Sequence, residues 1–163
     1  MFNRSFRSNV AALAGILITI GGCSESPAGA GSQFVVRDGG ARFAASGTSS
    51  AVITPAGGTL QTAAGDRIVF PAGAVAEPTT ITVTSSAQYA GVELEPHGLR
   101  FPAGSEPVLQ INTNGSNARI FRSLDIVYVD ESGVVSEVLP TAVGSGATQA
   151  NLQHFSGYLV AGH

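Results

Sequence analysis

The sequence predicts an all-β protein: an antiparallel β-sandwich of roughly nine short strands. From residue 51 onward, short β-branched runs alternate with turn residues about every ten positions, which is the spacing of a sandwich or barrel. The 163 residues include 21 glycines and 8 prolines, so regular elements must be short. Hydrophobic residues make up 44% of the chain and charged residues 12%, which is apolar enough to build a core and argues against disorder.

Residues 1–22 have the form of a secretory signal peptide. Arg4 and Arg7 lie in a start that has no acidic residue, and residues 10–20 are apolar. A spanning helix needs about 20 apolar residues, so this run is too short to cross a bilayer stably. We therefore expect the segment to direct export and then to be removed.

The apolar run ends in Ile20-Gly21-Gly22-Cys23, which resembles a bacterial lipobox. The resemblance implies diacylglycerol on the sulfur of Cys23, and two or more acyl chains hold a protein firmly on a membrane. The alternative is an ordinary signal peptide followed by a chance cysteine. Ser24 follows the cysteine, which resembles the rule for transfer to the outer membrane in Gram-negative bacteria. We expect a lipid-anchored protein of the cell envelope.

Residues 23–50 are rich in Gly, Ala and Ser, and their only apolar run is Phe34-Val35-Val36. Such a composition is typical of a flexible tether. We expect the tether to lift the domain of residues 51–163 off the membrane, with a short strand at 33–37 as an alternative for part of it.

The domain's strands are expected wherever an apolar, β-branched run lies between two turn signals. The candidate strands are Ala51–Thr54, Thr59–Thr62, Arg67–Phe70, Thr79–Ser85, Val92–Leu94, Val108–Thr113, Ser123–Val129, Val134–Leu139, Gln149–His154 and Gly157–Ala161. Residues 120–128 also fit helical spacing, but the run Ile126–Val129 favours a strand. Residues 130–133, Asp-Glu-Ser-Gly, are typical of a hairpin turn.

Three groups of residues resemble a known family. They are Gly57-Gly58-Thr59-Leu60 with Asp66 through Val75, then Leu94-Glu95-Pro96-His97-Gly98-Leu99 with Pro107-Val108, and finally His154-Phe155-Ser156-Gly157-Tyr158. Together they resemble the ZU-five domain of ankyrins, netrin receptors and zonula occludens proteins, over about residues 51–163. The resemblance implies an antiparallel sandwich that serves as an interaction or structural module.

Charge and cysteine content exclude several classes of function. Without the signal peptide, six arginines stand against eleven acidic residues, a net charge of −5. Nucleic-acid binders need a basic footprint, so we expect no nucleic-acid partner. Cys23 is the only cysteine, which excludes disulfides within the chain and a cysteine-rich zinc site. We expect no cofactor.

Glu93, Glu95 and His97 alternate along the sequence, so in a strand they would share one face and could hold a divalent metal. The simpler interpretation is a half-solvated strand in which Val92 and Leu94 point inward and the two glutamates face water. We favour the simpler interpretation and expect no metal.

His154-Phe155-Ser156 is the only candidate for catalysis. In some relatives with ZU-five domains, a His-Phe-Ser motif cleaves its own chain between Phe and Ser. His154 would take the hydroxyl proton of Ser156, whose oxygen would attack the preceding carbonyl to form an ester that water cleaves. The alternative is that Phe155 is a core residue between two outward polar residues. We expect an uncut chain, because a cut would release only residues 156–163 and open a sheet edge.

The sequence therefore favours a non-enzymatic envelope lipoprotein that binds an unknown envelope protein or serves structure. Self-processing at Phe155–Ser156 is the second hypothesis. A carbohydrate-binding module is the third, weakened by the absence of Trp and by the presence of only three Tyr.

Overall fold

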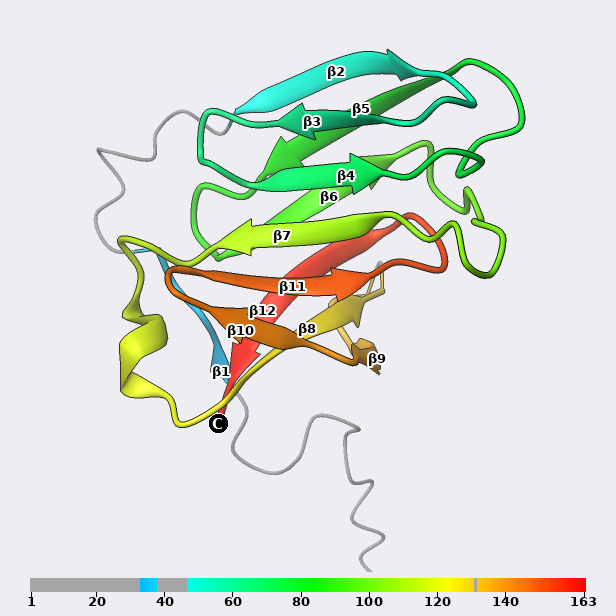
Figure 1. The fold of residues 1–163 in the computed structure, drawn as a ribbon. Coiled ribbons are helices and arrows are strands. Elements are labelled where there is room, and N and C mark those ends of the chain that lie inside the picture. The colour runs from blue at the N-terminus through cyan, green and yellow to red at the C-terminus, as the bar shows by residue number, and fades with distance from the viewer. Residues whose placement is uncertain (1–32, 38–46, 131) are drawn as a thin grey trace, which may run out of the picture.

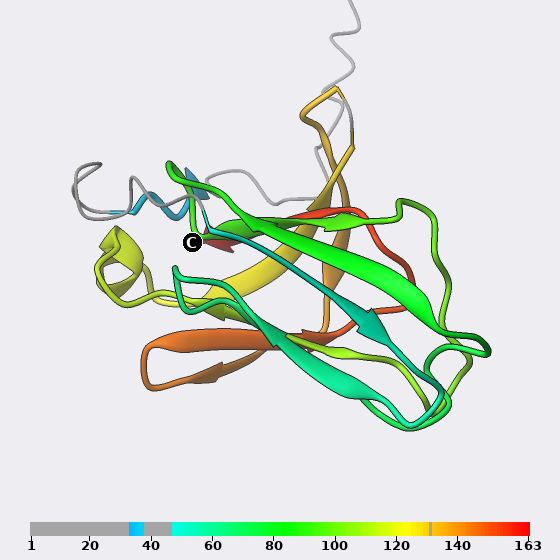
Figure 2. The same ribbon diagram turned by 90° about the horizontal axis from the view of Figure 1, so that it is seen from above.

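The computed structural model describes residues 33–37, 47–130 and 132–163, which form two facing antiparallel sheets (Figures 1 and 2). The first sheet has the order β2-β5-β6-β12-β8-β9, with β1 beside β12, and the second has the order β10-β11-β7-β4-β3. The strands are β1 Gln33–Phe34, β2 Thr48–Ile53, β3 Gly58–Gln61, β4 Arg67–Phe70, β5 Thr79–Ser85, β6 Gly91–Glu95, β7 Val108–Asn112, β8 Leu124–Val129, β9 Val135–Leu139, β10 Ala142–Gly144, β11 Ala147–Asn151 and β12 Gly157–Gly162. The predicted all-β sandwich is confirmed.

The core lies between the sheets and follows the period-two alternation of the strands. In β5, Ile81 and Val83 are buried while Thr82 between them is not, and in β7 Leu109 and Ile111 are buried. At one end of the core, the rings of Phe70, Phe101 and Phe155 form a cluster. Each pair packs edge to face, with ring centroids 5.0–6.2 Å apart.

The predicted strands agree with the observed ones to within a few residues at each end, and β4 and β5 match at both ends. The described residues form twelve strands rather than the roughly nine that were predicted. One strand that the sequence did not predict is β10, whose three residues are all exposed, so no apolar alternation marks it. The ambiguous segment is a strand, β8, preceded by one turn of 3₁₀ helix, η1, at Asn117–Ile120.

The sandwich begins earlier than the predicted boundary at residue 51. Strand β1 pairs with β12, Val35 is fully buried, and β2 starts at Thr48. Parts of the predicted tether 23–50 therefore belong to the folded domain, including the alternative strand at 33–37. The predicted signal peptide, Cys23 and the rest of the predicted tether lie outside the described residues.

Strands β8 and β12 pair with each other over their full lengths, and the two ends of this pair mark two ends of the molecule. In their register, Gly157 lies opposite Val129 and Gly162 lies opposite Leu124. The tether end carries Gly162, β1 and η1 (Figure 1). The groove end carries Gly157 and Val129, together with the turn after β6.

Candidate functional site: a polar groove at one end of the sandwich

A cavity of about 470 Å³ opens at the groove end, and it joins two groups of residues that the sequence analysis treated separately. Glu93 and His97 line it from β6 and the following turn, and His154 and Ser156 line it from the segment before β12. Strand pairing explains this meeting, because Gly157 lies opposite Glu93. We call this cavity the groove.

On the β6 side, Nε2 of His97 lies 2.6 Å from Oε1 of Glu93, and both side chains are about half exposed. Val92 and Leu94 are buried, whereas Glu93 and Glu95 are exposed, so the predicted alternation is confirmed. The pair joins one carboxylate and one imidazole. No group of three His, Cys, Asp or Glu residues suited to a metal ion occurs within the part of the chain that the structure describes.

On the β12 side, the imidazole of His154 is held by its surroundings. Its Nδ1 lies 3.4 Å from the hydroxyl of Tyr158, its Nε2 lies 3.5 Å from Oε2 of Glu137, and its ring packs edge to face on Tyr128. The Tyr158 hydroxyl donates a hydrogen bond of 2.6 Å to the carbonyl oxygen of His154. Among the described residues, no hydrogen bond joins His154 to Ser156.

Burial raises the pKa of the Tyr158 phenol above its ordinary value of 10.0, and the negative charge of Glu137 and the neighbouring Tyr128 raise it further. The phenol therefore stays protonated and remains a hydrogen-bond donor to the His154 carbonyl at any neutral pH.

The peptide between Phe155 and Ser156 is fixed through its backbone. The Phe155 carbonyl accepts a hydrogen bond of 3.1 Å from the Gly98 amide, and the Phe155 amide donates one of 2.8 Å to Leu99. The Phe155 side chain is 1% exposed and belongs to the core. The structure thus places Phe155 inward and leaves its two polar neighbours, His154 and Ser156, on the groove.

The turn between β8 and β9 fixes a further wall of the groove. Asp130 accepts hydrogen bonds from the Ser132 amide and hydroxyl, the Val134 amide and the Ser136 hydroxyl. These bonds, that of the Ser132 hydroxyl above all, lower the pKa of Asp130 below its ordinary value of 3.8. The wall therefore carries a negative charge at neutral pH. As predicted, β8 and β9 pair as an antiparallel hairpin.

The floor of the groove is open because Gly157 has no side chain. A Cβ atom there would lie 2.8 Å from Oε2 of Glu93. A second cavity of about 320 Å³ shares Glu93, Val129, Asp130 and Gly157 with the groove and continues past Thr84 and Leu159. The hollow therefore extends along the outer face of the first sheet.

A buried polar cluster that was not predicted from the sequence lies at the tether end. Nη2 of Arg37 lies 2.9 and 2.8 Å from the two carboxylate oxygens of Asp66, and neither side chain is exposed. Asp66 also accepts hydrogen bonds from the Ser85 hydroxyl and the Asn112 amide, and Arg37 also donates to the carbonyls of Tyr89 and Asn112. One signal was present in the sequence for Arg37, which directly follows the apolar run Phe34-Val35-Val36.

Cys23, the predicted lipidation site, lies outside the described residues. Residues 33–37, 47–130 and 132–163 contain no helix that is long and apolar enough to cross a membrane. The chain matches no protein-family model and no curated protein.

Proposed function

We propose that this chain is a lipid-anchored protein of the cell envelope whose sandwich binds a protein partner in the groove, without catalysis. The anchor rests on Ile20-Gly21-Gly22-Cys23 after an apolar run. The observation that carries the binding function is the groove itself, where side chains from three separate segments converge on an open floor.

The chemistry of the groove suits a polypeptide. Glu93 and Asp130 offer carboxylate acceptors, whereas Arg100 and His97 offer donors, so both kinds of peptide hydrogen-bonding group find partners. Mixed, partly exposed polar surface is typical of non-obligate protein interfaces. The resemblance of residues 51–163 to the ZU-five domain supports the same proposal, because that family uses its sandwich as an interaction or structural module.

Site-specific photo-crosslinking in intact envelopes tests the binding function. A photoreactive residue at Arg100, which lines the groove, should yield a discrete protein adduct. The same residue at Val52, which is 59% exposed on strand β2, is the control and should yield none. Equal adducts from the two positions, or none from either, would contradict the proposed interface.

Metabolic labelling with a fatty acid tests the anchor separately. The wild-type protein should take up the label, and Cys23→Ser should not, because serine lacks the thiol that accepts diacylglycerol. A wild-type protein that carries no label would remove the lipid anchor from the proposal.

Self-cleavage between Phe155 and Ser156 is the second candidate. One observation favours it: the Gly98 amide already donates to the Phe155 carbonyl, where negative charge would develop during attack. Against it, the ring of His154 makes its contacts with Tyr158, Tyr128 and Glu137. We expect the intact mass of the purified protein to be that of an uncut chain. Loss of residues 156–163 from the wild type, prevented by Ser156→Ala, would establish cleavage instead.

A further inference from the structure

We infer that the tether end of the sandwich docks on the surface of an anionic phospholipid membrane through a patch formed by Val36, Arg119, Ile120 and Arg122. This inference rests on the proposed lipid anchor and adds an orientation to it. We call these four residues the η1 patch.

The patch is held rigidly on the sandwich although its side chains are exposed. The Val36 amide donates to Oδ1 of Asn117 at 2.8 Å, and the Asn117 amide donates to the Val36 carbonyl at 3.0 Å. Directly after η1, the ring of Phe121 lies against Gly162, where a Cβ atom would overlap the ring. These contacts attach η1 both to the segment beside β1 and to the end of β12.

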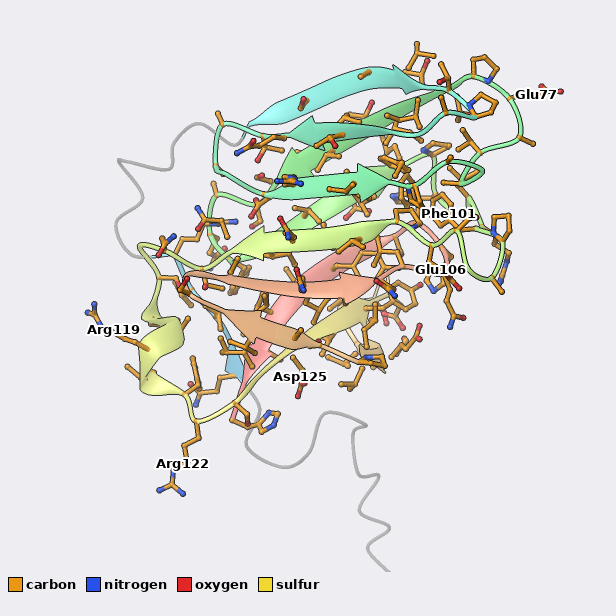
Figure 3. The ribbon with its side chains drawn as sticks, in the orientation of Figure 1. Glu77, Phe101, Glu106, Arg119, Arg122 and Asp125 are labelled. Atoms are coloured by element: carbon orange, nitrogen blue, oxygen red, sulfur yellow. The ribbon has the colours of Figure 1, made fainter. Side chains whose placement is uncertain are left out.

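The patch combines an exposed aliphatic side chain with two cations. Ile120 is 66% exposed, the highest value among the large exposed hydrophobic residues of the described chain. Arg119 and Arg122 flank it and project away from the body (Figure 3). Guanidinium groups bind phosphate through paired hydrogen bonds, and an aliphatic side chain between them can enter the headgroup region.

No acidic side chain near η1 pairs with Arg119 or Arg122 among the described residues, so both arginines are available to the lipid. Asp125 is the nearest acidic residue along the chain, and its Oδ2 lies 3.5 Å from Nε2 of His163. The positive charge of both arginines is therefore directed outward, toward an anionic surface.

The position of the anchor brings this patch to the membrane. Gln33 pairs with Gly162, so the chain from Cys23 reaches the sandwich at the tether end. Ten residue steps separate Cys23 from Gln33 and span at most about 36 Å. The buried Arg37–Asp66 pair holds residues 33–37 in place. A tether running to residue 51 would have allowed about 100 Å.

Because the segment between Cys23 and Gln33 is short, the η1 patch can dock on the membrane even if its own affinity for lipid is weak. Anchoring turns docking into an intramolecular event with a high effective concentration, so two arginines and one isoleucine need little intrinsic affinity. The groove then faces away from the lipid, because Gly157 lies five residues along β12 from Gly162, a distance of about 17 Å.

Fluorescence quenching in vesicles tests this orientation. Cys23 is the only cysteine and its sulfur carries the lipid under the proposal, so Ile120→Cys and Ala103→Cys each add one free thiol for a fluorophore. Ala103 is exposed in a turn at the other end of the sandwich. The lipidated proteins are placed in vesicles of phosphatidylethanolamine and phosphatidylglycerol that contain a nitroxide-labelled lipid. We expect stronger quenching at position 120 than at position 103.

Charge variants show whether the arginines cause the contact. Adding Arg119→Gln and Arg122→Gln to Ile120→Cys should abolish the excess quenching, whereas adding Arg67→Gln, an exposed arginine on β4, should preserve it. Replacing phosphatidylglycerol by phosphatidylcholine should weaken the excess. Equal quenching at positions 120 and 103 in protein that floats with the vesicles would overturn the docking inference and leave the anchor standing.

Absence of the lipid would overturn the anchor instead. In that case the unlipidated mature chain is added to the same vesicles at high lipid concentration, with Cys23→Ser so that the introduced thiol remains unique. Stronger quenching at position 120 than at 103 would still support docking, and equal quenching would overturn it.

Discussion

The two ends of the sandwich place an acidic and a basic side chain together in different surroundings. At the tether end, Arg37 and Asp66 form an ion pair with no exposure of either side chain. At the groove end, Glu93 and His97 lie even closer, at 2.6 Å, but about half of each side chain is exposed. The buried pair fixes the fold, whereas the exposed pair leaves its donors and acceptors accessible to a partner.

Solvent explains this difference. A buried charge that loses its partner has no water to replace it, whereas an exposed charge is rehydrated at once. The stability of the protein should therefore be sensitive to polar substitutions at the tether end and tolerant of them at the groove end. Binding should show the reverse sensitivity.

The largest effect is expected from Arg37→Met. Removing one member of a buried ion pair costs about 3–5 kcal/mol, because the remaining charge of Asp66 is left uncompensated. Chemical denaturation measures this loss. Arg67→Met is the control, since Arg67 is exposed on β4, and it should change the free energy of unfolding little.

A second variant shows whether charge or packing is responsible. Arg37→Met combined with Asp66→Leu removes both charges and should recover part of the lost stability. A double variant less stable than Arg37→Met would mean that the hydrogen bonds of Asp66 to Ser85 and Asn112 outweigh the ion pair.

Substitutions at two glycines of β12 show how tightly each end of the sandwich is packed. At Gly162 a Cβ atom would overlap the ring of Phe121, whereas at Gly157 it would meet only the mobile end of the Glu93 side chain. Gly162→Ala should cost about 1–3 kcal/mol, as overpacking does. Gly157→Ala should leave the unfolding midpoint almost unchanged. Equal losses in the two variants would show that the groove floor is as tightly packed as the tether end.

Tyr158→Phe should have a smaller effect, since it removes the hydroxyl that donates to the His154 carbonyl and lies 3.4 Å from Nδ1 of His154. A hydrogen bond such as that to the carbonyl contributes about 0.5–1.5 kcal/mol. The variant should also resist alkali better. The folded state raises the pKa of this phenol above 10.0, so above that pH the unfolded chain releases the proton while the folded chain keeps it. Stability is then complete below pH 10 and falls as the pH rises further. Denaturation of both proteins between pH 8 and about 11 measures the difference.

The fold was predictable because, in most strands, the apolar residues of the sequence are also the residues that are buried in the structure. In β5, buried residues alternate with less buried ones from Thr80 to Ser85, and the loop before the strand contains Pro71, Gly73 and Pro78. Strand β10 lacks that alternation and is held by its hairpin partner β11, whereas β1 has only two residues and is held by the distant strand β12. The ion pair of Arg37 with Asp66 joins residues 29 positions apart, which no local pattern reveals.

The groove was predictable only in pieces. Glu93, His97, His154 and Ser156 stood out individually as polar residues beside apolar ones. Their convergence depends on the register of β6 with β12, where Glu93 lies opposite Gly157. Register is a long-range property, so the sequence indicated two small motifs where the fold makes one surface.

The smallest effect on stability, and the sharpest test of the contrast between the ends, is expected from Glu93→Gln. Even a fully charged exposed pair contributes only about 0.2–1 kcal/mol, and the contact of Glu93 with His97 is half exposed, so the unfolding midpoint should move little. Glutamine keeps the shape of the side chain but removes the charge and one acceptor, so the crosslinked adduct formed from position 100 should decrease. Glu95→Gln is the matched control, because Glu95 is exposed on the same strand, and it should leave the adduct intact. If Glu93→Gln unfolds the protein as readily as Arg37→Met does, then the groove end is structural and the contrast between the two ends is wrong. If it changes neither stability nor adduct, the partner does not use this carboxylate, and its contact rests on other side chains of the groove.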